Sequence, residues 1–188
     1  TAGNPNVAIG YQALYTNTSG EANVAIGRDA LQAANANYNI AVGYQSLYSN
    51  TTGSGNTAAG YQALYSSTNA SPNAAFGFQA LYANTTGDEN AAFGHTALNS
   101  ATTAAANSAF GSRVMRATTT GAFNSAFGYA ALIVNTTGGY NVAVGAGSLQ
   151  ANTSASGSTA VGYQAGFSNQ TGAENTFLGN VAGYTTTG

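Results

Sequence analysis

A five-residue segment in which bulky and small side chains alternate recurs along the chain. It begins with Asn in all copies but one, which has Ser, and ends with Gly, as in residues 6–10 with the sequence NVAIG. Alternation with a period of two is typical of a β-strand, whose successive side chains point to opposite faces. Each copy therefore predicts a short strand with bulky residues on one face and small residues on the other.

The segment occurs eleven times, at a spacing of 17 residues apart from one spacing of 16. No stretch is left over for a linker or a second domain, so we expect residues 1–188 to form a single repeat domain. The one deletion falls between Arg28 and Asn39, around a turn, where changes in length are tolerated. The copies begin at Asn6, Asn23, Asn39, Asn56, Asn73, Asn90, Asn107, Asn124, Asn141, Ser158 and Asn175.

A single repeat of this length cannot bury its own apolar face, but stacked repeats can do so through ladders of like residues. We therefore predict an all-β fold, a parallel β-solenoid (β-roll) of eleven coils. Because stacked strands lie about 4.8 Å apart, the coils would form a rod roughly 50 Å long. The alternative is a strand followed by a short helical turn at the recurring segment YQALY, as in leucine-rich repeats, which run about 20–29 residues.

The fifth position of the repeat is Gly in every copy, which allows a corner or a close approach of two backbones. A chain that stacks coil on coil needs such a corner after each strand. The glycine column comprises Gly10, Gly27, Gly43, Gly60, Gly77, Gly94, Gly111, Gly128, Gly145, Gly162 and Gly179.

Two further columns predict the apolar ladders of the coil. The ninth position is mostly Leu, which we expect to fill the coil, and Gly166 and Gly183 replace it in the last two copies and would loosen them. The fourth position is bulky, and we expect it inside the coil or at a seam between chains, with four phenylalanines stacked ring on ring. The predicted ladders comprise Ile9, Ile26, Val42, Phe76, Phe93, Phe110, Phe127, Val144, Val161 and Leu178, and Leu14, Leu31, Leu47, Leu64, Leu81 and Leu98.

Composition excludes several classes of function. Only 4% of the residues are charged and the net charge is −2, so the surface is polar but nearly neutral, without the basic patch of a nucleic-acid-binding protein. The absence of cysteine excludes disulfides and thiolate chemistry. No apolar run approaches the about 20 residues of a membrane-spanning helix, so we expect no membrane insertion. The few carboxylates lie mostly in turns, and we expect no enzyme, no metal site and no cofactor.

Two sets of residues are candidates for contact or modification. Tyrosines at the tenth position suit contact with a carbohydrate, a protein or a sister chain. Asn-x-Ser/Thr sequences recur in one column and would carry sugars along one edge if glycosylated, although unmodified turn residues are the preferred interpretation. We interpret His95, Arg113 and Arg116 as variants of the repeat. The tyrosines are Tyr15, Tyr48, Tyr65, Tyr82 and Tyr184, and the asparagines are Asn17, Asn50, Asn84, Asn135, Asn152 and Asn169.

The segments at 6–10 and 23–27, and more loosely those at 107–111 (NSAFG) and 124–128, resemble the head repeats of trimeric autotransporter adhesins, the YadA-like family. The chain is also similar to longer repeats in phage tail fibres and bacterial surface fibres. It differs from the family in its longer coil and in the YQALY segment. The resemblance implies a left-handed parallel β-roll with three chains around one axis, located outside the cell or on a virion fibre, with adhesion or receptor contact as its role.

These patterns lead to three hypotheses. The first is a non-enzymatic structural and adhesive module of an extracellular fibre that forms a homotrimer and contacts a host surface protein or glycan. The second is a filament subunit that stacks head to tail, because both ends fall in phase in the turn region, at 1–5 and 185–188, without evident caps. The third is ice binding through rows of Thr, although adjacent Thr residues are expected to point to opposite faces.

Overall fold

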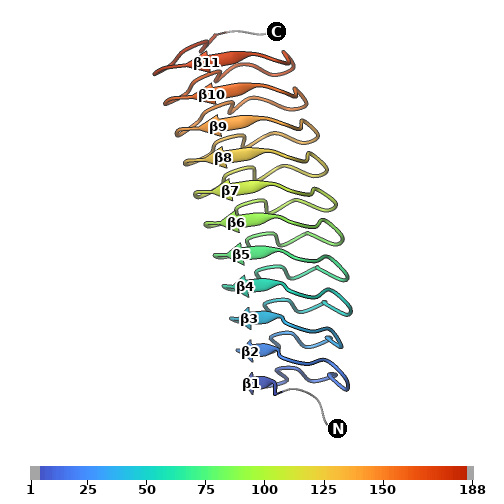
Figure 1. The fold of residues 1–188 in the computed structure, drawn as a ribbon. Helices are drawn as coiled ribbons and strands as arrows, with labels where there is room; N and C mark the ends of the chain where they lie inside the picture. Colours follow the sequence, from blue (N-terminus) through green and yellow to red (C-terminus); the bar gives the residue numbers. More distant parts are fainter. Residues whose placement is uncertain (1–4, 186–188) are drawn as a thin grey trace.

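The computed structural model describes residues 5–185 and is a parallel β-solenoid (Figure 1). Each strand pairs in parallel with the next strand along the chain, which confirms the predicted fold. No helix occurs within residues 5–185, so the strand-plus-helix alternative is wrong. The eleven strands are β1 (Val7–Ile9), β2 (Val24–Ile26), β3 (Ile40–Val42), β4 (Thr57–Ala59), β5 (Ala74–Phe76), β6 (Ala91–Phe93), β7 (Ser108–Phe110), β8 (Ser125–Phe127), β9 (Val142–Val144), β10 (Thr159–Val161) and β11 (Thr176–Leu178).

The strands remain in register along the whole rod, and β1 and β11 lie at its opposite ends (Figure 1). The coil that is one residue shorter, between Asn23 and Asn39, does not disturb the register. Val24 pairs with Ile40 across it, just as Val7 pairs with Val24 across a full-length coil. The missing residue lies in the outer turn, because Ala36 accepts the hydrogen bond from Asn23 that Ala70 accepts from Asn56 in a full-length coil. Most of the in-phase end segments, residues 1–4 and 186–188, lie outside the described part of the chain.

The fifth-position glycines form the corner that follows each strand. Gly111 has a φ of +140°, and a Cβ at this position would lie 2.6 Å from the carbonyl oxygen of Gly128 in the next coil. Both the backbone conformation and the distance between coils therefore require a residue without a side chain.

The segment after the corner is a turn in which left-handed residues alternate with ordinary ones. Gln62 has a φ of +53° and Leu64 a φ of +52°, and the same two positions are left-handed in each coil. A non-glycine residue in this conformation costs about 1–2 kcal/mol. Fully burying a leucine side chain contributes about 1.5–3 kcal/mol, which offsets this cost. The conformation thus points Leu64 into the coil, where its side chain is fully buried.

The interior of the coil is narrow. Ala58 on β4 and Leu64 on the turn are both fully buried and belong to one continuous core. The last coil repacks this interior, because Phe177 takes the place of the strand Ala and packs against the core. A Cβ on Gly166 would lie 2.6 Å from Cδ2 of Phe177. Gly166 and Gly183 therefore make room for the Phe177 ring, and the expectation that they loosen the last coils stays a prediction.

No helix long and apolar enough to cross a membrane is found among residues 5–185.

Candidate contact surfaces

The second- and fourth-position side chains lie on the outer face of the sheet, which we call the strand face. Ile9 is 58% exposed and Phe127 is 41% exposed, whereas Ala126 between the outward positions of β8 is fully buried. The space between the strand and the ninth-position Leu holds only an Ala, so the bulky residues must point outward. The expectation of an internal ladder is therefore wrong for Ile9, Ile26, Val42, Phe76, Phe93, Phe110, Phe127, Val144, Val161 and Leu178, and a seam between chains stays a prediction for them.

The ninth-position ladder does lie inside the coil. Leu31 and Leu98 are fully buried, and Leu14 in the first coil is 9% exposed. Met115 and Leu149 continue the column beyond the expected members. The described core includes Leu14, Leu31, Leu47, Leu64, Leu81 and Leu98.

Aromatic rings stack along the rod in several rows. On the strand face, the ring centroids of Phe93 and Phe110 are 4.7 Å apart with an interplanar angle of 5°. The predicted phenylalanine ladder from Phe76 to Phe127 is continuous. These distances match the spacing between strands, so the repeat itself sets the stacking.

The tenth-position tyrosines form a second row on the turn segment. The centroids of Tyr48 and Tyr65 are 5.2 Å apart, as are those of Tyr65 and Tyr82. Tyr15 lies apart at the start of the rod and is 67% exposed, and Tyr184 stacks on Phe167 instead. Of the five candidate tyrosines, the structure therefore brings three together.

A third row, at the sixth position, runs beside the tyrosines and includes His95. The ring of Phe78 stacks on Tyr61 and on His95, with centroids 5.1 Å and 5.2 Å away. Beside these rows, Nε2 of Gln79 donates to Oε1 of Gln62, and Nε2 of Gln62 donates to Oε1 of Gln45, each at 3.0 Å. Rings stacked in this way present their edges and hydroxyl groups to solvent, so a ligand would meet hydrogen-bonding groups and not ring faces.

Partial burial, and then the charges that would develop on Tyr48, Tyr82 and Tyr44, raise the pKa of Tyr65 above its usual value near 10. The unfolded chain loses this proton at about pH 10 while the folded chain keeps it, so stability falls as the pH rises past 10. We expect Tyr65→Phe to lose less melting temperature than the wild type between pH 9 and pH 11. Circular dichroism melts would check this, with the exposed Tyr15→Phe as control, and equal losses in all three proteins would contradict it.

The candidate glycosylation residues occupy the inside of the turn and do not form a row along an edge. Asn50 is fully buried, its Nδ2 donates to the carbonyl oxygen of Gly53 at 2.8 Å, and its Oδ1 accepts from the Gly53 amide at 3.0 Å. A sugar on Nδ2 would have no space in this fold. Asn84, Asn135, Asn152 and Asn169 are also fully buried, and Asn17 is half-buried. A surface role for this column is therefore wrong and the interpretation as turn residues is confirmed, since the short amide closes a turn that runs from Asn50 to Gly53.

The first-position Asn column is the main internal feature that the sequence analysis did not assign. Nδ2 of Asn124 donates to the carbonyl oxygen of Gly138 at 2.9 Å, and Oδ1 of Asn107 accepts from the Asn124 amide at 2.9 Å. Asn124 and Asn107 are fully buried. The presence of Asn at the start of ten copies was the signal that could have revealed this ladder, because a solvated turn residue would vary more between copies.

The threonine rows occupy the outer turn. Thr51 donates its hydroxyl to the carbonyl oxygen of Thr68 at 3.1 Å, and Thr119 does the same to Thr136. Thr51 and Thr52 are both exposed, and the expectation that adjacent Thr residues point to opposite faces stays a prediction. The hydroxyls of the Thr51 row join neighbouring coils and are therefore already engaged.

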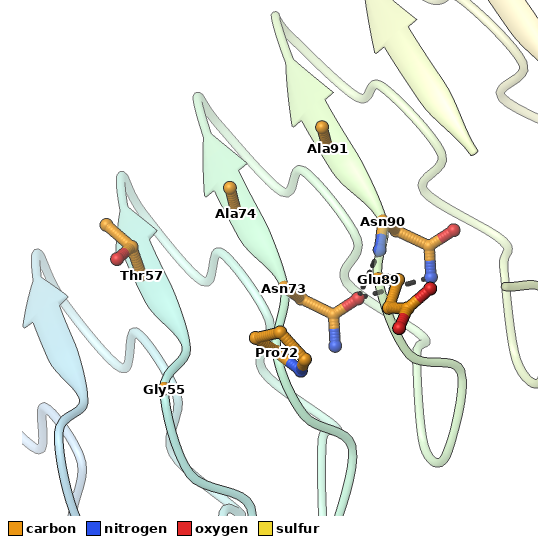
Figure 2. A pocket seen from close by; sticks show the side chains of 8 residues that line it. All are labelled: Gly55, Thr57, Pro72, Asn73, Ala74, Glu89, Asn90 and Ala91. Carbon is orange, nitrogen blue, oxygen red and sulfur yellow. Dashed lines mark hydrogen bonds between the residues drawn. The ribbon is translucent and has the colours of Figure 1, made fainter. Parts of the chain in front are cut away.

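A shallow hollow of about 280 Å³ lies along one border of the strand face (Figure 2). Thr57, Ala74 and Ala91 form it on three consecutive strands, and Pro72 and Glu89 lie beside them (Figure 2). Each of these second-position residues is small, in contrast to Val24 and Ile40 in the coils before them. The hollow is therefore a shallow depression where the outward side chains of the strand face are small, and it is not an enclosed pocket.

The ionisable residues are dispersed over the rod. Arg113 donates to the hydroxyl of Tyr129 at 3.3 Å, and Arg116 is exposed. The neighbouring Val114 and Met115 replace the usual Ala or Ser and Leu and remain fully buried, so this degenerate copy keeps an apolar interior. Residues 5–185 contain no group of three His, Cys, Asp or Glu side chains that could hold a metal ion.

In comparisons with protein-family models, with curated proteins and with solved structures, nothing matches the chain.

Proposed function

We propose that the chain is a non-enzymatic structural and adhesive module of an extracellular fibre, and that it associates with other copies of itself through the strand face. The observation that carries this proposal is the uncovered apolar surface of an eleven-stranded sheet. Val7, Ile40, Val42, Phe76 and Val144 are 37–44% exposed on it. Extended apolar surface of this kind marks an interface in soluble proteins.

The turn segment of the rod is suited to contact with a ligand. Two aromatic rows and an amide row run along the turn segment and present ring edges, hydroxyls and amides to solvent. A periodic polar surface of this kind fits a host glycan or surface protein that binds by hydrogen bonds. The Tyr48, Tyr65 and Tyr82 row is the contact surface that we assign to such a partner.

Light scattering and sedimentation velocity test the association. We expect the purified chain to be oligomeric at micromolar concentration, and Val42→Lys to weaken association at least tenfold because its ammonium group would be buried without a partner. A tenfold loss corresponds to about 1.4 kcal/mol. Thr120→Lys on the outer turn is the matched control and should leave association unchanged. A stable monomer at high concentration would remove the proposal.

Electron microscopy of the producing cells or particles, with a labelled antibody, tests the location. Label on projecting rods would support a fibre module, and label confined to the cell interior would contradict it. Long threads with an axial repeat of about 50 Å would instead favour a filament in which coils stack head to tail.

A further inference from the structure

The two outward rows of the strand face change size in opposite directions along the rod. Where the fourth position is Phe, from β5 to β8, the second position is Ala or Ser. Where the fourth position is Ile or Val, as in β1 to β3 and β9, the second position is Val or Ile. A ridge of stacked rings thus runs beside a low row of small side chains on the same face.

The low row overlaps the hollow at β5 and β6. Ala74 and Ala91 line the hollow, and Phe76 and Phe93 stand two residues away on the same strands. On the border of the hollow, Pro72 and Glu89 occupy the column that holds exposed rings at Tyr38 and Phe123 elsewhere. The low row of Ala and Ser runs beside the whole ridge from β5 to β8, and it is deepest at the hollow.

We propose that a second copy of this chain covers the strand face, running parallel and level, so that the phenylalanine ridge of each copy packs on the low row of Ala and Ser of the other. This inference rests on the proposed function and names the partner of that same surface. A twofold axis along the rod produces such a pair, because it reverses the face from side to side and leaves each coil at its own height. The fourth position of a coil then meets the second position of the same coil in the partner.

The opposite orientation does not fit the surface. A twofold axis across the rod places fourth positions against fourth positions, so that the ridge from Phe76 to Phe127 would meet another ridge. The rings would hold the sheets apart, and the hollow over Ala74 and Ala91 would stay empty. Loss of packing on both rows disfavours this arrangement, since interfaces approach the packing density of protein interiors.

Polar groups on the two borders agree with the parallel pair. Glu89 lies on the border beside the second position, and His95 lies just past the corner on the other side of the same coil. In the parallel pair, the Glu89 carboxylate faces the partner's imidazole at the same height on both sides of the axis. Complementary borders fix the register of an interface.

The area is adequate for a stable dimer. From the residue before each first-position Asn to the corner Gly, the face is about 16 Å wide, and eleven strands make it about 50 Å long. Two such faces would bury about 1,600 Å², in the middle of the roughly 1,200–2,000 Å² of stable complexes. The strand face is therefore large enough to hold two rods together without further contacts.

Exchanging the small and the large side chain of one strand tests the pairing, with association measured by sedimentation velocity. Ala91→Phe fills the hollow and Phe93→Ala removes part of the ridge, and we expect each to weaken association at least tenfold. The double variant A91F/F93A restores a large residue opposite a small one, and we expect it to associate more tightly than either single variant. Thr86→Phe, an exposed turn position, controls for an added ring. A double variant no tighter than the weaker single variant would overturn the proposal.

Cross-linking tests the orientation without disturbing the ridge. The chain has no cysteine, so thiols introduced as Val142→Cys and Val144→Cys would be the only reactive sites. With a short bifunctional maleimide, a mixture of the two single variants should give a covalent dimer, and neither variant alone should. The double-cysteine variant should stop at a dimer, and a covalent trimer would overturn the twofold pair.

These outcomes separate the two proposals. A chain that stays monomeric removes both the proposed function and the pairing. A chain that associates, but shows neither rescue in A91F/F93A nor cross-links between the mixed variants, keeps the proposed function and removes the parallel pair.

Discussion

Replacing Gly111 with alanine is expected to lower the free energy of unfolding by several kcal/mol. The new Cβ would lie 2.6 Å from the carbonyl oxygen of Gly128, which belongs to the backbone of the next coil and cannot turn aside. The φ of +140° adds strain, because residues with a side chain rarely adopt it. Strained backbone and overpacking each cost about 1–3 kcal/mol, so we expect a loss of roughly 2–6 kcal/mol. Thermal and denaturant unfolding followed by circular dichroism would measure it.

Gly55→Ala is the matched control for this prediction. Gly55 also has a positive φ, of +72°, but a Cβ there would lie 3.6 Å from Pro72 in ordinary contact. Other coils carry Ala22 and Ala106 in this column with φ values of 53° and 54°, so the structure accepts alanine there. We expect a change of about 1 kcal/mol or less. Equal losses in Gly55→Ala and Gly111→Ala would show that the distance between coils is not the cause.

Asn124→Ala is expected to cause the second large loss of stability. The side chain of Asn124 donates to Gly138 and to Asn107, and its Oδ1 accepts from the backbone amide of Asn141 at 3.0 Å. Truncation would leave buried polar groups without partners on both sides of the coil. Each unsatisfied group costs about 1–3 kcal/mol, so we expect a loss of roughly 2–5 kcal/mol in the free energy of unfolding.

Two further variants show whether the buried amide is the cause. Asn124→Ser should lose less than Asn124→Ala, because Ser158 occupies the same column and accepts from the amide of Asn175 at 3.3 Å. Asn69→Ala, at an exposed position of the outer turn, should change stability by less than about 0.5 kcal/mol. If Asn124→Ala is as mild as Asn69→Ala, the ladder contributes little to the rod.

The sequence predicts the repeat, the parallel stacking and the glycine corner because each depends on the period alone. It does not predict which side of the strand faces inward. Bulky residues alternate with Ala, and the usual expectation places the bulky ones inside. Here the turn returns Leu64 so close to the strand that only an Ala fits beneath it, and this distance depends on the turn conformation.

The sequence does not predict this turn conformation, for a physical reason. Left-handed Leu and Gln are disfavoured, so a segment such as Gln62–Leu64 gives no local sign of it. The available signal was the replacement of these residues by Gly147, Gly166 and Gly183 in the same two columns, where φ is 63–68°. Similarly, the buried Asn columns resemble ordinary turn residues, because their role depends on what the neighbouring coil places opposite them.

The hydrogen bonds that join the coils have a consequence for the growth of such rods by duplication. They connect residues 15 to 18 positions apart, with 15 positions from Val24 to Asn39 across the short coil and 16 from Ala74 to Asn90, and the pattern is the same from coil to coil. Insertion or removal of one whole repeat therefore changes the length by a single step of about 4.8 Å and leaves the chemistry of every side unchanged. The number of repeats encoded in the gene therefore sets the length of the rod.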